Sequence, residues 1–299
     1  MNTHAILLLS LGVGFSTRAA AASDDAVYTQ QTETWRAQRL AQLTKPDGWL
    51  TLIGLHFLKD GDNTVGSAAD NDVVLAKGPA HFGTVTVAAN GTVTVALSAA
   101  ADARIDGKAV LAGELAWREG ARPSIVSAGT VSFFVIERGG KKALRAKDSG
   151  SERRTHFLGL DYYPIDPAWR IEAQWVEFDE PRNLSITNVL GQLEPAIVHG
   201  KVVFDRDGKK FELLPIDQGP GEPLFFVIAD ATTGKETYGG GRFLYADAPV
   251  DGKVVVDFGR AQNPPCAFTP FATCPLPPKE NRLPFAVPAG EKNYRGGHE

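Results

Sequence analysis

The sequence predicts an all-β fold in which an N-terminal helix is followed by a small β-sandwich and then by a larger antiparallel β-sandwich or barrel. The 299 residues include 31 glycines and 19 prolines but few long helical patterns, which is typical of many short strands joined by turns. Residues 84–88 and 92–96 alternate with period two around Asn90-Gly91, a dipeptide that favours the positive φ angles of a tight hairpin. The length predicts two domains.

The first 22 residues have the pattern of a secretory signal peptide. Ala5–Phe15 is an apolar run, and Ala20-Ala21-Ala22 offers a small-residue cleavage site before Ser23, although Met1–His4 lack Lys and Arg. We therefore expect a mature chain that begins near Ser23 and is secreted or periplasmic. No other apolar run reaches about 18 residues, so we expect no membrane span in the mature chain.

Residues 23–48 are predicted to form the N-terminal helical segment. The apolar positions indicate one amphipathic helix over residues 26–44, with Trp35, the stem of Arg39 and Leu43 on one face. The following Lys45-Pro46-Asp47-Gly48 is a helix stop signal.

Residues 49–135 are predicted to form the first β domain. Its segments 65–67, 71–75, 78–81 and 105–108 follow one another in the order found in forkhead-associated sandwiches, which this region resembles over about 50 residues. Ser67 and Gly78 stand where that family places its phosphate-binding Arg and Ser. The resemblance therefore implies the fold and not phosphothreonine binding.

Residues 136–299 are predicted to form the second β domain, which ends in a loop rich in Pro and Cys. Turn signals such as Asp207-Gly208 separate short apolar segments, which is typical of an antiparallel sandwich or barrel. The predicted strands are 201–205, 210–214, 224–228, 242–245 and 254–258.

The most informative segment is 263–278, which holds both cysteines and six of the nineteen prolines. Proline fixes φ and lacks an amide donor, so this segment is predicted to be an irregular loop, and long irregular loops tend to be functional. In an exported protein, Cys266 and Cys274 favour a disulfide. A thiol nucleophile, a metal site and plain buried thiols remain as alternatives. We expect no metal and no cofactor.

Several motifs together resemble the bacterial domain-of-unknown-function family 1684. They are 47–55, 157–164, 187–191, 237–244, 263–268, 274–278 and 281–283. The resemblance spans nearly the whole mature chain but implies little about function, because the family has no settled activity. Gly259 and Gln262 depart from the family pattern, which usually has Asn and Tyr there.

A ligand site is predicted beside the loop rich in Pro and Cys. Tyr238, Arg242 and Asp257 are expected to face one cavity next to Asn263 and Cys266, with Arg242 and Asp257 on neighbouring antiparallel strands. An ion pair between Arg242 and Asp257 with a purely structural role is the alternative. The predicted ligand-binding residues are Tyr238, Arg242, Asp257, Asn263 and Asp230.

Two polar segments outside this cavity have alternative interpretations. Residues 230–242 are interpreted as a turn or as an anion site at Arg242. The polar residues of segment 145–156 are interpreted as a solvated loop. In the alternative interpretation, one Arg and one acidic residue of this segment point into the mouth of a barrel and bind a ligand there.

These features favour an exported protein that binds a small ligand without catalysis. One alternative is a hydrolase that uses Asp230, Asp257 or Glu236 as acid and base, with Arg242 stabilising charge. Another is a structural protein of the cell envelope. The net charge of −4, without a block of Lys or Arg, argues against a nucleic-acid partner. The oligomeric state stays open.

Overall fold

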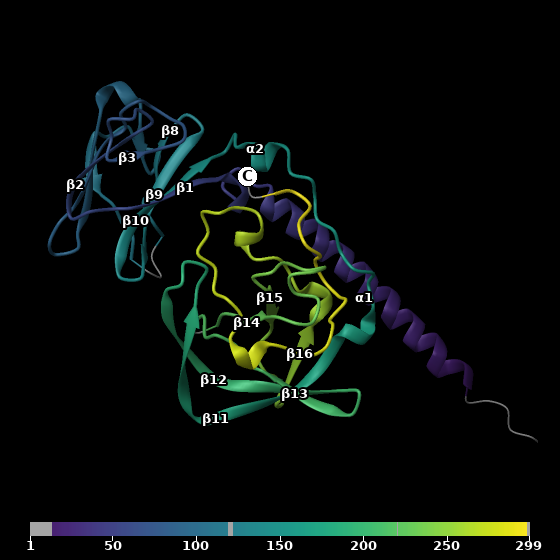
Figure 1. Cartoon of the computed structure of the whole chain (residues 1–299). Helices are drawn as coiled ribbons and strands as arrows, with labels where there is room; N and C mark the ends of the chain where they lie inside the picture. Colours follow the sequence, from purple (N-terminus) through teal and green to yellow (C-terminus); the bar gives the residue numbers. More distant parts are fainter. Residues whose placement is uncertain (1–13, 119–121, 220, 298–299) are drawn as a thin grey trace, which may run out of the picture.

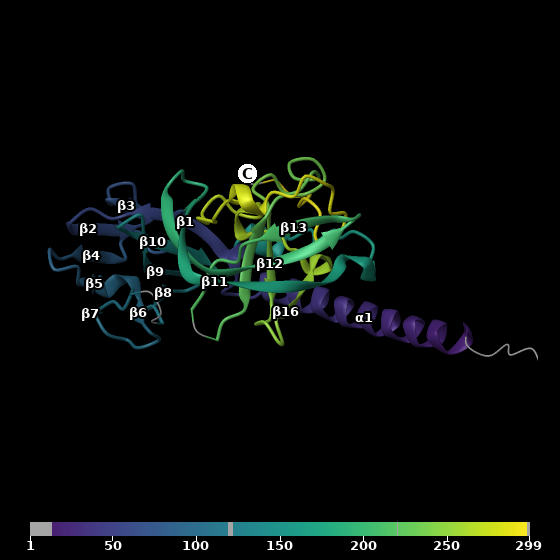
Figure 2. The same ribbon diagram turned by 90° about the horizontal axis from the view of Figure 1, so that it is seen from below.

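A computed structural model describes residues 14–118, 122–219 and 221–297 of the chain. Figure 2 shows a β-sandwich at one end of the molecule, while the N-terminal part of helix α1 projects from the other end. The fold is mostly β with one long N-terminal helix, as the sequence predicts. No helix in the described ranges combines the length and apolar character needed to cross a membrane.

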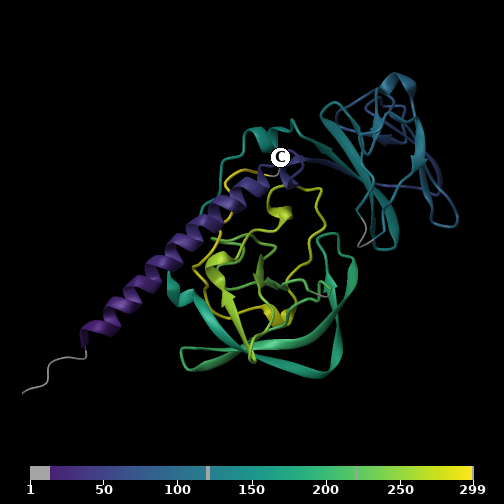
Figure 3. The same ribbon diagram turned by 180° about the vertical axis from the view of Figure 1, so that it is seen from behind.

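Helix α1 (Gly14–Leu43) packs along one side of the C-terminal β region (Figures 1 and 3). Tyr28, Thr32 and Leu43 are buried, so positions about four residues apart form the packed face. The helix starts earlier than the predicted residue 26 and ends one residue before Thr44, just ahead of Pro46. The predicted signal peptide falls partly on residues 1–13, which lie outside the described residues.

The small sandwich consists of two five-stranded sheets around one apolar core. The sheet orders are β1-β10-β9-β8-β6 and β3-β2-β4-β5-β7. The strands are β1 (Leu52–Phe57), β2 (Gly61–Gly66), β3 (Val73–Val74), β4 (Gly83–Val87), β5 (Val93–Leu97), β6 (Arg104–Ile105), β7 (Ala112–Glu114), β8 (Val126–Ala128), β9 (Val131–Arg138) and β10 (Lys141–Asp148). The Asn90-Gly91 hairpin is confirmed, because β4 pairs with β5 in register from Val87↔Val93.

The strand pairing of the sandwich does not stop at residue 135, where the sequence placed a domain boundary. Strand β9 runs across that position, and β10 pairs with both β9 and β1. The division of the chain into two β domains stays a prediction. Arg145 and Asp148 lie on β10 and are buried, so the interpretation of residues 145–156 as a solvated loop is wrong for these two.

The C-terminal region contains a four-stranded sheet, a separate strand pair and a second apolar core. The sheet order is β13-β12-β11-β16, and β14 pairs with β15. The long β11–β12 pair curves around the core in which β14 and β15 lie (Figures 1 and 3). The strands are β11 (Arg170–Thr187), β12 (Leu193–Arg206), β13 (Lys209–Leu213), β14 (Leu224–Ile228), β15 (Arg242–Ala246) and β16 (Lys253–Asp257).

Short helical turns complete the chain, and the loop rich in Pro and Cys is irregular, as predicted. It contains one turn of 3-10 helix, and a second turn follows directly after its last residue, Pro278. The short helices are α2 (Glu152–Thr155), η1 (Trp49–Thr51), η2 (Ala99–Ala101), η3 (Pro167–Trp169), η4 (Phe258–Arg260), η5 (Pro265–Ala267) and η6 (Lys279–Asn281).

Candidate functional site

The predicted site residue Arg242 is buried in the core of the C-terminal region. Its side chain is 0% exposed and forms an ion pair with Asp230, with 2.7 Å between Nη2 and Oδ2. The same guanidinium donates to the carbonyls of Val287 and Ala289. The preceding Gly241 has φ +84° and lies against Pro277, where a Cβ would not fit, so glycine lets Arg242 enter the core.

The predicted ion pair between Arg242 and Asp257 is therefore wrong. Strand β15 pairs with β14, which places Arg242 opposite Ile228, whereas Asp257 on β16 lies opposite Arg170 on β11. The two strands belong to different sheets, so the short Asp251-Gly252 turn does not make these residues cross-strand neighbours. The partner of Arg242 is instead Asp230, which the sequence analysis placed in a turn and among the predicted ligand-binding residues.

Tyr238 and Asn263 are held by other contacts. The Tyr238 hydroxyl donates to the backbone carbonyl of Cys266 at 3.1 Å. Asn263 is buried; its backbone N–H donates to Glu291 Oε2 at 2.7 Å, and its side-chain Nδ2 donates to the Lys292 carbonyl at 2.8 Å. Of the five predicted ligand-binding residues, Asp257 alone lines the pocket described next.

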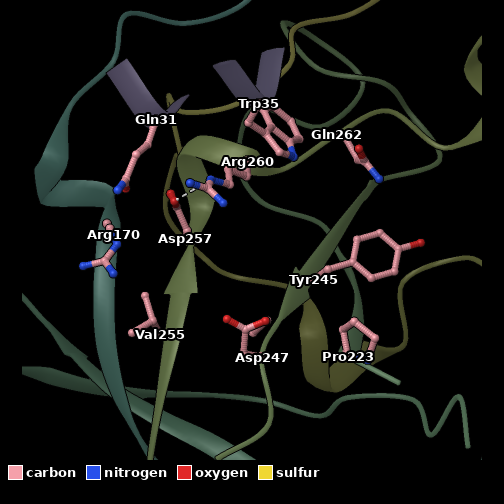
Figure 4. A pocket seen from close by; sticks show the side chains of 11 residues that line it. Gln31, Trp35, Arg170, Pro223, Tyr245, Asp247, Val255, Asp257, Arg260 and Gln262 are labelled. Atoms are coloured by element: carbon pink, nitrogen blue, oxygen red, sulfur yellow. Dashed lines mark ion pairs between the residues drawn. The ribbon is translucent and has the colours of Figure 1, made fainter. Parts of the chain in front are cut away.

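That pocket has a volume of about 320 Å³ and lies between helix α1 and the ends of strands β11, β15 and β16 (Figure 4). We call it the Asp257 pocket. Cross-strand pairing places Arg170 beside Asp257. Because every second side chain of a strand points to the same face, Val255 on β16 lines the pocket together with Asp257, and Tyr245 lines it from β15. Its lining residues are Gln31, Trp35, Arg170, Pro223, Tyr245, Ala246, Asp247, Val255, Asp257, Arg260 and Gln262.

Asp257 is the most strongly held group in this pocket. It is 6% exposed, and its Oδ1 accepts hydrogen bonds from the Tyr28 hydroxyl at 2.8 Å and from the Gly259 amide at 3.0 Å. Arg260 Nε lies 3.2 Å from its Oδ2. Burial nevertheless raises the pKa of Asp257 above its ordinary value, although these partners oppose the shift. Burial, together with the Asp257 charge, also raises the pKa of Tyr28 to about 12.

Other polar groups of the Asp257 pocket have room for an additional partner. Within the described chain, the side chains of Arg170 and Asp247 form no hydrogen bond or ion pair, and both residues are exposed. In Figure 4, Gln31 and Trp35 reach down from α1 toward the pocket, which Gln262 also lines. Arg170, Arg260, Asp247 and Asp257 carry two positive and two negative formal charges, so the pocket is polar but balanced.

Asp257→Asn is expected to flatten the pH dependence of stability. Because burial raises the pKa of Asp257, the folded chain binds this proton more tightly than the unfolded chain. The resulting stabilisation is complete below the unfolded-state pKa and is lost as the pH rises through the folded-state pKa. Urea unfolding between about pH 3.5 and pH 7 should show this loss in the wild type but not in the variant. The exposed Asp205→Asn is the matched control, and equal pH slopes for wild type and Asp257→Asn would contradict the expectation.

The cysteines differ from the sequence prediction. Cys266 and Cys274 are buried and free, so the predicted disulfide is wrong for this structure. The loop holds the two residues by reciprocal hydrogen bonds from each backbone amide to the other sulfur, at 3.3 and 3.2 Å. The described part of the chain contains no group of three or more His, Cys, Asp or Glu that could hold a metal ion.

Comparison with known proteins identifies a family but no activity. A family model described as "Protein of unknown function (DUF1684)" matches residues 155–292, a range that includes most of the Asp257 pocket and both cysteines. A search of curated proteins finds no match. Among solved structures, the chain is similar to an uncharacterized protein of Haloarcula marismortui studied by solution NMR. The identity is 33% over 46% of this chain and 78% of that chain, with a TM-score of 0.39.

Proposed function

The chain belongs to the DUF1684 family of proteins of unknown function, and we propose that it binds a small polar molecule in the Asp257 pocket. One observation carries this proposal. Helix α1 and strands β11, β15 and β16 surround a pocket whose polar side chains can form further hydrogen bonds. A volume of about 320 Å³ is at the lower end of the range for ligand pockets. The pocket therefore suits a compact ligand.

The chemistry of the pocket favours a neutral, polyhydroxylated ligand such as a monosaccharide. Arg170, Gln31 and Gln262 offer donors, while Asp247 and Asp257 offer acceptors, and a hydroxyl group can use both kinds. The formal charges cancel, so no net charge selects an ion. The rings of Trp35 and Tyr245 provide apolar surface for the faces of a sugar ring.

Removing one polar group from the Asp257 pocket is expected to weaken sugar binding about 10- to 150-fold, since a hydrogen bond to a charged group contributes about 1.5–3 kcal/mol. Asp247→Asn and Arg170→Gln suit this test because both residues are exposed and form no internal ion pair. Saturation-transfer NMR with glucose, galactose and mannose should show binding to the wild type and weaker binding to both variants.

Two controls make this test specific. Asp205→Asn removes an exposed carboxylate on β12, which does not line the pocket, and should bind like the wild type. Glucuronate tests the charge argument, because its carboxylate should weaken binding relative to glucose. Equal binding by all variants, or preference for glucuronate, would count against this ligand class.

Export is a second part of the proposal. It is supported by the apolar run Ala5–Phe15 and the Ala20-Ala21-Ala22 segment of the sequence. We propose that the protein binds its ligand in the periplasm or outside the cell, with a mature chain that begins near Ser23. N-terminal sequencing of protein from the exported fraction tests this, and an intact Met1 in the cytoplasm would contradict it.

The raised pKa of Asp257 favours hydrolysis as the alternative function. A carboxyl group whose pKa is raised by burial is better suited to act as a general acid, and Asp247 is a second carboxylate in the same pocket. Asp230 and Arg242 do not enter this alternative, because they neutralise each other in the core. Release of p-nitrophenol from p-nitrophenyl glycosides by the wild type, abolished in Asp257→Asn, would favour hydrolysis over binding alone.

A further inference from the structure

The two cysteines lie side by side in the loop and direct their sulfur atoms toward each other's backbone. Cys266 and Cys274 are each 6% exposed. The Cys266 amide donates to Cys274 Sγ at 3.3 Å, and the Cys274 amide donates to Cys266 Sγ at 3.2 Å. Amide donors of this kind stabilise negative charge on sulfur. Pro264, Pro265 and Pro275 restrict the loop, so the pair is preorganised.

A buried arginine without a carboxylate partner faces this pair. Arg145 on β10 is 5% exposed, and none of the ion pairs in the described ranges includes it. Its Nη2 lies 3.5 Å from Thr273 Oγ1, directly beside Cys274, while its Nε has no hydrogen-bond partner. The guanidinium also lies over the Trp49 ring, 5.4 Å from the ring centroid, which is a cation–π contact and supplies no negative charge. A buried cation is costly unless it is paired.

The geometry favours a negative charge at the two sulfurs. Each sulfur accepts a hydrogen bond from a backbone amide, and the buried Arg145 guanidinium lies beside Thr273 without a carboxylate partner in the described residues. Arg145 therefore balances one negative charge.

We propose that Cys266 and Cys274 bind one Cu(I) ion as two thiolate ligands, with Arg145 as the counter-charge. Thiolates select soft ions such as Cu(I). In the binding step, Cu⁺ forms two Cu–S bonds and displaces one proton from each thiol, so two protons leave and no electron is transferred. Two thiolates and one monovalent cation carry a net charge of −1, which matches the single charge of Arg145.

The two sulfur donors argue against zinc, the commoner structural metal. Zinc takes four ligands in structural sites, and the described residues bring no third His, Cys, Asp or Glu to the pair. A divalent ion with two thiolates would also be neutral and would leave Arg145 unbalanced. The site is separate from the Asp257 pocket, so this proposal does not depend on the proposed function.

Anaerobic titration of the full chain with Cu(I), in competition with bicinchoninate, tests the proposal. The expected result is one Cu(I) per chain with release of about two protons, since thiol ligands must be deprotonated. Cys266→Ser and Cys274→Ser should each weaken binding at least a hundredfold. Arg145→Met should weaken it about 10- to 100-fold, in the range for outer partners of a metal site.

Arg138→Met is the matched control for Arg145→Met. Arg138 Nε also donates to Thr273 Oγ1, at 2.9 Å, but Arg138 is only partly buried, whereas Arg145 is 5% exposed. This variant should bind Cu(I) within about threefold of the wild type. If both arginine variants lose Cu(I) affinity equally, the effect comes from the contacts of the two arginines with the loop, and Arg145 is not the counter-charge.

Two measurements on the wild type keep the proposal falsifiable even if the cysteine variants fail to fold. Thiol titration of the denatured, anaerobically reduced sample should find two free thiols. X-ray absorption at the copper edge should show two sulfur neighbours only. Two free thiols without bound Cu(I), a disulfide that persists after reduction, or a copper shell with nitrogen or oxygen ligands would each overturn the proposal.

Discussion

Arg242→Met is expected to destabilise the fold by about 3–5 kcal/mol, the range for removing one partner of a buried ion pair. Both Arg242 and Asp230 are 0% exposed at the side chain, so Met would leave the Asp230 carboxylate buried without its cation. The carbonyls of Val287 and Ala289 would also lose their donor. Equilibrium urea unfolding measures the change.

Two further variants show that burial causes the effect. Lys253→Met breaks an ion pair with Glu172 in which both side chains are at least half exposed, and it should cost no more than about 1 kcal/mol. Arg242→Lys keeps the charge but loses the planar fork that reaches Asp230 and two carbonyls together, so an intermediate loss is expected. Equal losses for Arg242→Met and Lys253→Met would show that the core pair does not stabilise the fold.

Glu291→Ala is expected to destabilise the chain by about 3 kcal/mol and to loosen helix α1. Glu291 is 0% exposed and accepts hydrogen bonds from Arg39 Nε at 2.9 Å and from the Asn263 amide at 2.7 Å. Arg39 also donates to the Asn263 carbonyl, so one buried carboxylate joins the helix to the loop rich in Pro and Cys. Hydrogen exchange should increase across residues 24–43.

Glu33→Ala is the matched control, because Glu33 lies on the same helix and is exposed. Exchange across α1 should remain unchanged in that variant. If Glu291→Ala leaves α1 fully protected and the free energy of unfolding unchanged, the helix is held by its apolar face alone.

The parts of the fold that the sequence predicts best depend on local signals. Asn90-Gly91 and Asp207-Gly208 both specify hairpins, and both are present. Strand β11 was not predicted, because its period-two alternation at Ile171, Ala173 and Trp175 is interrupted by a charged segment that contains Pro181. It is held instead by β12 and β16 on its two sides, a long-range pairing that no local pattern reveals.

The candidate site was predicted less completely for the same reason. Asp257 was predicted as a neighbour of Arg242 on an adjacent strand; it does line the pocket, but it lies opposite Arg170 on β11. Trp35 and Arg170 were missed as pocket residues, because they meet Asp257 only through the docking of α1 and through cross-strand register. The partner of Arg242 was assigned wrongly because β15 and β16 follow each other in sequence but belong to different sheets.

The most direct test of the Asp257 pocket uses the indole N–H signals of the five tryptophans. Trp35 lines the pocket (Figure 4), whereas Trp49, Trp117, Trp169 and Trp175 lie outside it. In a ¹⁵N-labelled chain, the signal missing from Trp35→Phe identifies Trp35. A neutral monosaccharide is predicted to shift that signal saturably and to leave the other four in place. No shift with glucose, galactose or mannose, or a saturable shift of another indole alone, would contradict the proposed binding site.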